Sequence, residues 1–204
     1  MEFVEKDSLR EMSRSVEGNQ NPVYLALGAN LPSNAGAAHE TLIAALIALV
    51  ANGFILTAIS RFFKTPAFPA GSGPDYVNAC IKVKSADSPE QILSTLHKIE
   101  AEFGRVRGAR WAARGCDIDL LAIGDLILPD VETQARWRGL PLAAQLVEAP
   151  DCLILPHPRM AERAFVLIPL HDIAPDFIDP VSGIAIKDLL AARPDAEKAE
   201  IWPI

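Results

Sequence analysis

Between residues 23 and 125 the spacing of apolar residues switches between strand-like and helix-like patterns, and this succession limits the folds open to the chain. Helical spacing occupies residues 34–50 and 88–103, and strand-like runs occupy 23–29, 54–65, 75–85 and 116–125. The order is therefore strand, helix, strand, strand, helix, strand. That order predicts an α+β fold, a ferredoxin-like βαββαβ sandwich in which helices cover one face of an antiparallel sheet.

Local signals mark some of the element boundaries. Ser88, Pro89 and Gln91 form the pattern of a helix start, with Ser88 as N-cap and Gln91 completing a capping box. The segment "PAFPAGSGP" is too rich in proline and glycine to continue a helix or a strand. Residues 165–173 and 185–192 show helical patterns, and we expect them to be extra C-terminal helices packed at one end.

The domain organisation follows from where these patterns begin and end. Residues 1–21 lack apolar periodicity, so we expect a flexible N-terminal tail. Residues 22–204 are expected to form a single domain large enough to bury a substantial core. Within it, residues 130–150 look like an insertion that lies on the surface over the nucleotide side.

Composition excludes several classes of function. The 19 basic residues face 26 acidic ones, a net charge of −7, so we expect no nucleic-acid partner. The three cysteines form no CxxC pair, the N-terminus has no apolar signal segment, and the longest apolar run is half a membrane span. These features predict a soluble cytoplasmic protein with no membrane partner, and we expect a monomer.

Asp117 and Asp119 form the first candidate site. They alternate on a predicted strand, so both carboxylates project from one face about 7 Å apart, while Ile118 and Leu120 point to the core. Two like charges on one face favour a cation between them, and hard oxygen ligands suit Mg²⁺. The alternative is a solvated sheet face with two unrelated acids, because an Asp-x-Asp pair alone is weakly specific.

A cluster of arginines precedes this pair: Arg105, Arg107, Arg110 and Arg114, with Trp111 among them. Guanidinium groups bind phosphate oxygens bidentately and remain charged. The dipole of the preceding helix explains cations at 105 and 107 but not those at 110 and 114. Trp111 is either a buried anchor or a ring that stacks on a flat heterocycle. Together these residues indicate phosphoryl transfer from a nucleotide.

The same stretch, "RVRGARWAARGCDIDL", resembles the signature R-W-x-x-R-x-x-D-[ILV]-D-[ILV] of the 6-hydroxymethyl-7,8-dihydropterin pyrophosphokinase family. Three further stretches resemble that family in the expected order: "VYLALGANLPSN", "FFKTPAFPAGSGPDYVNAC" and "LILPHPRMAERAFVLIPLHDIAPDF". The resemblance covers residues 23 to 180 and implies a ferredoxin-like fold. It also implies an enzyme of folate biosynthesis that transfers diphosphate from ATP to the pterin hydroxymethyl group and releases AMP.

Site residues follow from the resemblance position by position. Asp117 and Asp119 are implied to bind two Mg²⁺ ions and, with Arg107 and Arg114, to be catalytic. ATP is implied to contact Glu100, His97, Arg107, Arg110, Arg114, His157 and Arg163. The pterin is implied to contact Thr65, Pro66, Phe68, Asn78, Trp111 and Phe165.

Two other functional classes remain compatible with the residues. One is a different nucleotide-dependent transferase on the same fold, and the other is a non-catalytic ferredoxin-like module that binds a small ligand or RNA. Departures from the family pattern at His97, Cys152, Ile154 and Pro158 affect the details of adenine and ribose recognition.

Overall fold

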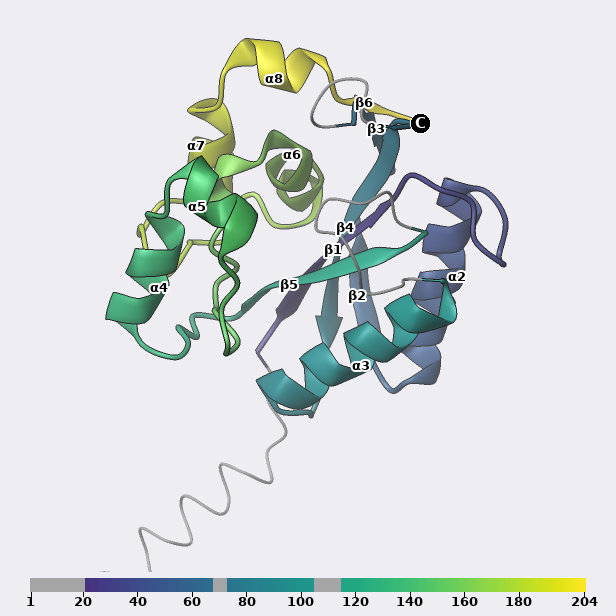
Figure 1. The fold of residues 1–204 in the computed structure, drawn as a ribbon, viewed down its shortest axis with the longest axis horizontal. Coiled ribbons are helices and arrows are strands. Elements are labelled where there is room, and N and C mark those ends of the chain that lie inside the picture. The colour runs from purple at the N-terminus through teal and green to yellow at the C-terminus, as the bar shows by residue number, and fades with distance from the viewer. Residues whose placement is uncertain (1–20, 68–72, 105–114) are drawn as a thin grey trace, which may run out of the picture.

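The computed structural model describes residues 21–67, 73–104 and 115–204, and its centre is an antiparallel sheet (Figure 1). The strands run in the order β5-β1-β4-β3-β6, and β2 also pairs with β4. Their bounds are β1 Val23–Ala29, β2 Ile55–Ile59, β3 Phe63–Thr65, β4 Tyr76–Lys84, β5 Asp117–Ile123 and β6 Trp202–Pro203. The predicted mixed α+β architecture with an antiparallel sheet is confirmed.

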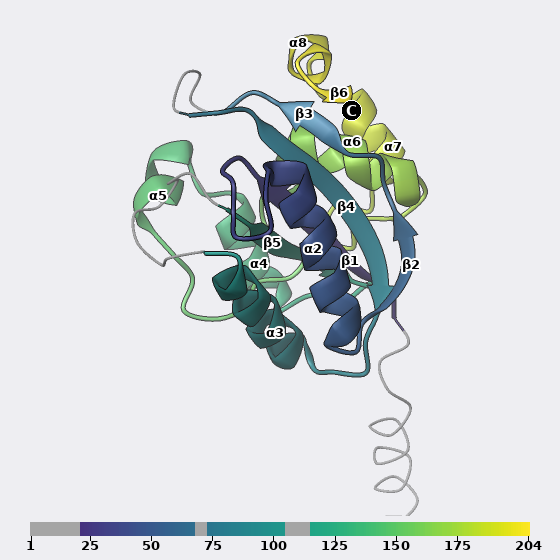
Figure 2. The ribbon, with the colours of Figure 1, turned by 90° about the vertical axis from the view of Figure 1, so that its right-hand side faces the viewer.

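Helices α2 (Ala38–Ala51) and α3 (Pro89–Glu102) cover one face of the sheet (Figure 2). Their buried residues form one core with the strands, which includes Leu25, Leu42, Leu49, Ile81, Leu96, Ile99 and Ile118. The predicted capping box of α3 is present, because the Ser88 hydroxyl accepts from the Gln91 N–H and the Gln91 side chain accepts from the Ser88 N–H.

Helix α6 (Ala164–Ile173) covers the opposite face and α7 (Ile186–Ala191) packs against α6, so the prediction that both pack at one end is wrong for α6. A second apolar cluster joins them to the sheet; it contains Tyr24, Cys80, Leu121, Met160, Val166, Leu167, Leu170 and Ile186. The physical reason is the composition of β4, in which consecutive apolar residues, Ala79, Cys80 and Ile81, point to alternate faces and are all buried. A strand that is apolar on both faces needs a cover on each.

The expected strand 54–65 is divided into β2 and β3. Ser60 interrupts it, because its backbone N–H donates to the Cys80 carbonyl and its side-chain Oγ, in place of a carbonyl, accepts from the Cys80 N–H. The next residue, Arg61, forms a bidentate ion pair with Asp172, in which Nε donates to Oδ2 at 2.9 Å and Nη2 donates to Oδ1 at 2.8 Å. The first helix begins at Ala38, later than expected, because Ser33 and Gly36 close a turn with two backbone hydrogen bonds.

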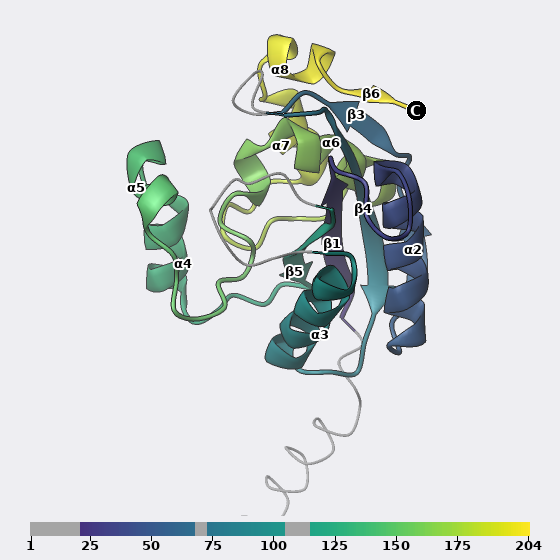
Figure 3. The same cartoon turned by 45° about the vertical axis from the view of Figure 1, so that its right-hand side comes forward.

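The expected insertion at 130–150 contains helices α4 (Val131–Arg138) and α5 (Leu142–Val147), which lie beyond the β5 edge (Figure 3). It is more than a surface excursion, because Gln134 is fully buried and its Nε2 donates to the Pro156 carbonyl at 3.0 Å. Arg138 forms a bidentate ion pair with buried Asp179. The remaining elements are the 3-10 helix η1 (Met160–Glu162) and α8 (Asp195–Ala199).

Among the described residues, every helix is too short or too polar to cross a bilayer.

Candidate active site

Three strands bring the predicted site residues into one row across the sheet. In the register, Gly28 of β1 lies opposite Asn78 of β4 on one side and opposite Asp117 of β5 on the other. One step along, Ala26 lies between Cys80 and Asp119. Directly paired residues project from the same face, so both aspartates and Asn78 lie on the face covered by α6.

Asp117 and Asp119 alternate with Ile118 and Leu120 as predicted. The aspartates are partly exposed and the two apolar residues are buried. No group of three or more metal-ligating acid, histidine or cysteine side chains occurs among the described residues. Two hard carboxylates on one face nevertheless fit Mg²⁺, which is commonly held by one or two carboxylates while substrate phosphates and water complete its shell.

Asn78 is anchored by Thr65 at the end of β3. Its Nδ2 donates to the Thr65 hydroxyl at 2.6 Å, and both residues are buried. This bond leaves the second amide hydrogen and the amide oxygen for another partner. The structure therefore brings together two of the residues predicted to contact the pterin.

Gly28 and Asn30 complete this region, and sequence reasoning missed both. A Cβ at position 28 would lie 2.9 Å from the Asn78 Oδ1, so only glycine leaves this amide in place. Buried Asn30 donates through Nδ2 to the Pro74 carbonyl at 3.2 Å, which ties the end of β1 to the proline-rich loop. A glycine inside an apolar strand was the available signal, because it often marks close approach of another group.

Arg163 and Phe165 lie at the start of α6. The Arg163 guanidinium carbon lies 5.6 Å from the centre of the Phe165 ring, within the range of a cation–π contact. Burial lowers the pKa of Arg163, while Asp119 acts in the opposite direction. Phe165 is 38% exposed, which shows that its ring is not part of the core.

His157 links the segment before α6 to β5. Its backbone N–H donates to the Leu121 carbonyl at 2.7 Å, and its ring Nδ1 accepts from the Arg159 backbone N–H at 3.1 Å. Burial and the nearby Arg163 lower the pKa of His157 to about 3, against the opposing effect of Asp117. The imidazole is therefore neutral near pH 7, with its proton on Nε2, where it can be donated.

Glu100 and His97 lie on α3, apart from this cluster. Glu100 is buried, and its Oε1 accepts from the Ile118 N–H at 2.8 Å. The carboxylate thus anchors α3 to β5 next to Asp117. His97 lies one helical turn away and is partly exposed.

Of the remaining predicted site residues, Pro66 is exposed. Phe68, Arg107, Arg110, Trp111 and Arg114 lie outside the described residues.

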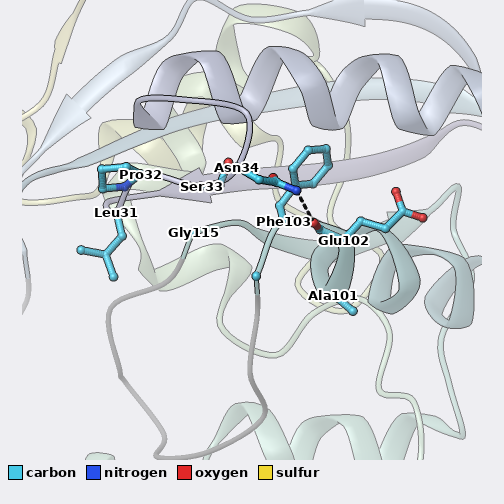
Figure 4. Close-up of a pocket in the computed structure, with 9 residues that line it drawn as sticks. Leu31, Pro32, Ser33, Asn34, Ala101, Glu102, Phe103 and Gly115 are labelled. Atoms are coloured by element: carbon cyan, nitrogen blue, oxygen red, sulfur yellow. Dashed lines mark hydrogen bonds between the residues drawn. The ribbon is translucent and has the colours of Figure 1, made fainter.

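A pocket of about 420 Å³ lies between the β1–α2 turn and the end of α3 (Figure 4). Across it, Asn34 Nδ2 donates to the Glu102 carbonyl at 3.1 Å. Its walls are Leu31, Pro32, Ser33 and Asn34 on one side, and Ala101, Glu102, Phe103, Gly104 and Gly115 on the other. None of these nine residues was predicted to contact ATP, the pterin or a metal.

Comparison with known proteins identifies the family. Residues 24–175 match the model of the 7,8-dihydro-6-hydroxymethylpterin-pyrophosphokinase (HPPK) family. The chain belongs to the HPPK family. The match begins in β1 and ends after α6, so every predicted site residue and the insertion lie within it.

Two relatives of this family are curated as 2-amino-4-hydroxy-6-hydroxymethyldihydropteridine pyrophosphokinase. The Synechocystis protein is 37% identical over 158 residues, which are 78% of this chain and 68% of the relative. The Haemophilus influenzae protein is 33% identical over 180 residues, 88% of this chain and 98% of the relative. Several curated HPPK relatives thus resemble this chain over most of its length.

Solved structures of a larger protein share the fold. The structure of Plasmodium falciparum HPPK-DHPS A437G/K540E with pterin and p-hydroxybenzoate superposes with a TM-score of 0.64 at 14% identity. The superposition covers 90% of this chain but 47% of that one, so this chain spans less than half of the larger protein. At this identity the likeness supports the HPPK-type fold alone.

Proposed function

We propose that this chain transfers diphosphate from ATP to the hydroxymethyl group of 6-hydroxymethyl-7,8-dihydropterin and releases AMP, as a step of folate biosynthesis. The family match over residues 24–175 supports this function, together with curated relatives named as pyrophosphokinases. The observation that carries it is the row of Asp117, Gly28 and Asn78, which sets a carboxylate beside an amide on one face.

The fold is consistent with this assignment. We assign the segment from β1 to β5 to a ferredoxin-like βαββαβ unit, because its strands lie in the order β5-β1-β4-β2 and are joined through α2 and α3. Helices α4 to α8 are then additions to that unit.

The pterin belongs on the side of Asn78. The free amide groups of Asn78 can pair with the donor and acceptor edge of the pterin, and the bond to Thr65 fixes the orientation of that amide. The exposed ring of Phe165 can stack on the flat heterocycle. The proposed pterin contacts are Thr65, Pro66, Phe68, Asn78, Trp111 and Phe165.

ATP phosphates belong beside Asp117, Asp119 and the start of α6. Arg163 offers a charged fork of donors there, and neutral His157 offers one donor from Nε2. The proposed ATP contacts are Glu100, His97, Arg107, Arg110, Arg114, His157 and Arg163, of which Arg107 and Arg114 also act in catalysis.

In the proposed reaction, the pterin hydroxyl oxygen forms a bond to the β-phosphorus of ATP and its proton is released to solvent. The bond between the β-phosphorus and the α–β bridging oxygen breaks, so the leaving group is AMP. Asp117 and Asp119 would hold two Mg²⁺ ions, which would supply charge neutralisation for the phosphate oxygens. The arginines orient the chain of phosphates so that the attacking and leaving oxygens lie in line.

A cytoplasmic location remains part of the proposal. Cys80 and Cys152 are free thiols, as expected of a protein kept in a reducing compartment.

An assay for AMP tests the reaction. Enzyme, ATP, Mg²⁺ and 6-hydroxymethyl-7,8-dihydropterin should give AMP, and 6-methyl-7,8-dihydropterin, which lacks the hydroxyl, should give none. Release of ADP, or AMP formation that does not require the pterin, would assign the chain to a different nucleotide-dependent transferase. Loss of both products with ATP still bound would favour a binding module.

A further inference from the structure

From Leu42 to Ser60 the chain contains no charged residue, although 22% of all residues are charged. This uncharged segment forms most of α2 and all of β2. Much of its apolar surface remains in solvent. The exposed fractions are 44% for Ile43, 66% for Ile47, 53% for Val50, 63% for Ile55, 38% for Leu56 and 44% for Ile59.

On β2, two of these side chains lie on the α2 side of the sheet. Leu56 pairs with Val83 and Ile59 pairs with Ile81, and both partners belong to the core beneath α2 and α3. Paired residues project from the same face. Leu56 and Ile59 therefore extend this face of the sheet beyond the helices.

On α2, the exposed residues lie on one flank. The core-facing residues are Leu42, Ala45 and Leu49, and Ile43 and Val50 each follow one of them by a single position, about 100° around the helix. For the usual right-handed β1–α2–β2 connection, that flank faces β2 and not α3. Figure 2 shows α3 on one side of α2 and β2 on the other.

We call Ile43, Ile47, Val50, Leu56 and Ile59 the α2–β2 face. Beside it, β2 is an edge, since in the described part of the chain it pairs with β4 alone. An apolar edge strand without charge or proline offers its free backbone groups to another strand. The α2–β2 face thus combines an apolar surface with an open sheet edge.

We propose that the α2–β2 face is the interface of a symmetric homodimer. Each copy carries a net charge of −7, so two copies repel each other least where no charged side chain lies between them. An anionic lipid surface is a poor match, because the face offers no lysine or arginine. Both faces of β2 carry apolar side chains, so we expect a strand that pairs with it to carry apolar side chains on both faces too. The β2 of a second copy does so when a two-fold axis relates the two copies.

This inference replaces the expectation of a monomer and leaves the proposed active site free. Asp117, Asp119 and Asn78 lie on the face covered by α6, whereas the α2–β2 face lies on the opposite side of the sheet. Substitutions in the interface should therefore separate the copies while each copy keeps its activity.

Sedimentation velocity of the full chain from about 1 to about 100 µM tests the proposal, because self-association depends on protomer concentration. We expect a species of twice 22.0 kDa to predominate as concentration rises. Ile47→Glu and Ile59→Lys, measured separately, should each raise the dissociation constant at least about tenfold, since each sets a charge in a desolvated contact. Val131→Glu on α4, a site that is 61% exposed, is the matched control and should leave the dissociation constant unchanged.

Melting temperature and AMP formation of every variant establish that it is folded. If Ile59→Lys fails to fold, Ile47→Glu on the helix surface still decides the question. A parent chain that stays at 22.0 kDa throughout the series would overturn the proposal, and so would equal effects of Ile47→Glu and Val131→Glu.

Discussion

Asp117 and Asp119 project from one face of β5, with Gly28 and Ala26 of β1 beside them. Removal of either carboxylate should reduce turnover far more than pterin binding, because charge redistribution around the phosphorus occurs in the transition state. We expect Asp117→Ala and Asp119→Ala each to lose at least about 10³-fold in turnover, about 4 kcal/mol.

The double variant should lose little more than the worse single one, since the two carboxylates are proposed to act together. Turnover is measured by AMP formation, and pterin binding is followed separately by fluorescence. Asp125→Ala, in the exposed turn that follows the same strand, is the control. Activity of both single variants within about tenfold of the parent would contradict the metal assignment.

Gly28→Ala tests the row across the sheet. The added Cβ would lie 2.9 Å from the Asn78 Oδ1, so the amide must shift. We expect weaker pterin binding by about 1–3 kcal/mol, the usual cost of a lost buried hydrogen bond, with ATP binding little changed. Titration of each ligand separately checks this. Equal weakening of both ligands would contradict it.

His157 predicts a pH dependence of stability. Its native pKa of about 3 lies below its ordinary value of 6.5, so the unfolded chain binds more protons between these values. The contribution of the neutral His157 to the free energy of unfolding is therefore complete above about pH 6.5. It is lost as the pH falls toward 3, by at most about 1.4 kcal/mol per pH unit.

Urea unfolding at pH 7, 6 and 5 should show a steeper loss in the parent than in His157→Asn, whose side-chain oxygen can replace Nδ1 as acceptor. Parallel curves for the two proteins would show that folding does not lower the pKa of His157.

At the scale of elements, the residues that specify helices and strands locally were readable. Ser88 and Gln91 predicted the start of α3, and alternation predicted β4 and β5. The division of residues 54–65 into two strands could not be predicted, because it depends on the hydrogen bonds between Ser60 and Cys80, which is distant in sequence. The cover of the second face by α6 likewise depends on tertiary packing, which outweighs local pattern.

Helix α4 illustrates this dependence on distant partners. Burial by itself raises the pKa of Asp179, but hydrogen bonds from Arg138 and Ser182 outweigh it and hold that pKa below its usual range. The Asp179 side chain is fully buried and that of Arg138 is 20% exposed. Arg138→Ala would leave a buried carboxylate without its cation.

We expect Arg138→Ala to reduce the free energy of unfolding by about 3 kcal/mol, as for other broken buried pairs. Exposed Arg136→Ala on the same helix should change it by less than about 0.5 kcal/mol. Chemical denaturation at pH 7 measures both. Similar values for the two variants would mean that the ion pair does not anchor the insertion.

At the scale of the whole molecule, the sheet separates two surfaces with different chemistry. One carries the aspartates, Asn78 and the start of α6, and the other carries the α2–β2 face. The motif predicted the residues of the first surface, and the structure added Gly28 and Asn30, whose roles depend on contacts with other segments. The second surface was not predicted, because a run of apolar residues does not reveal which side of a helix remains exposed.

Residues 1–20 lie outside the described part of the chain and outside the family match. Because they lack apolar periodicity, a truncation that begins at Asn21 should keep its melting temperature and turnover. Differential scanning calorimetry and the AMP assay check this. A fall of more than about 5 °C, roughly 1–2 kcal/mol at this size, would show that the tail packs on the domain.

The close approach of Gly28 to Asn78 also has an evolutionary consequence. A side chain at position 28 conflicts with the amide at 78, so the two positions cannot vary independently. A lineage that changes the proposed pterin contact at 78 to a smaller residue would first release position 28 from glycine, whereas the reverse order would pass through a variant in which the amide is displaced. Mutational paths through this pair should therefore run in one direction.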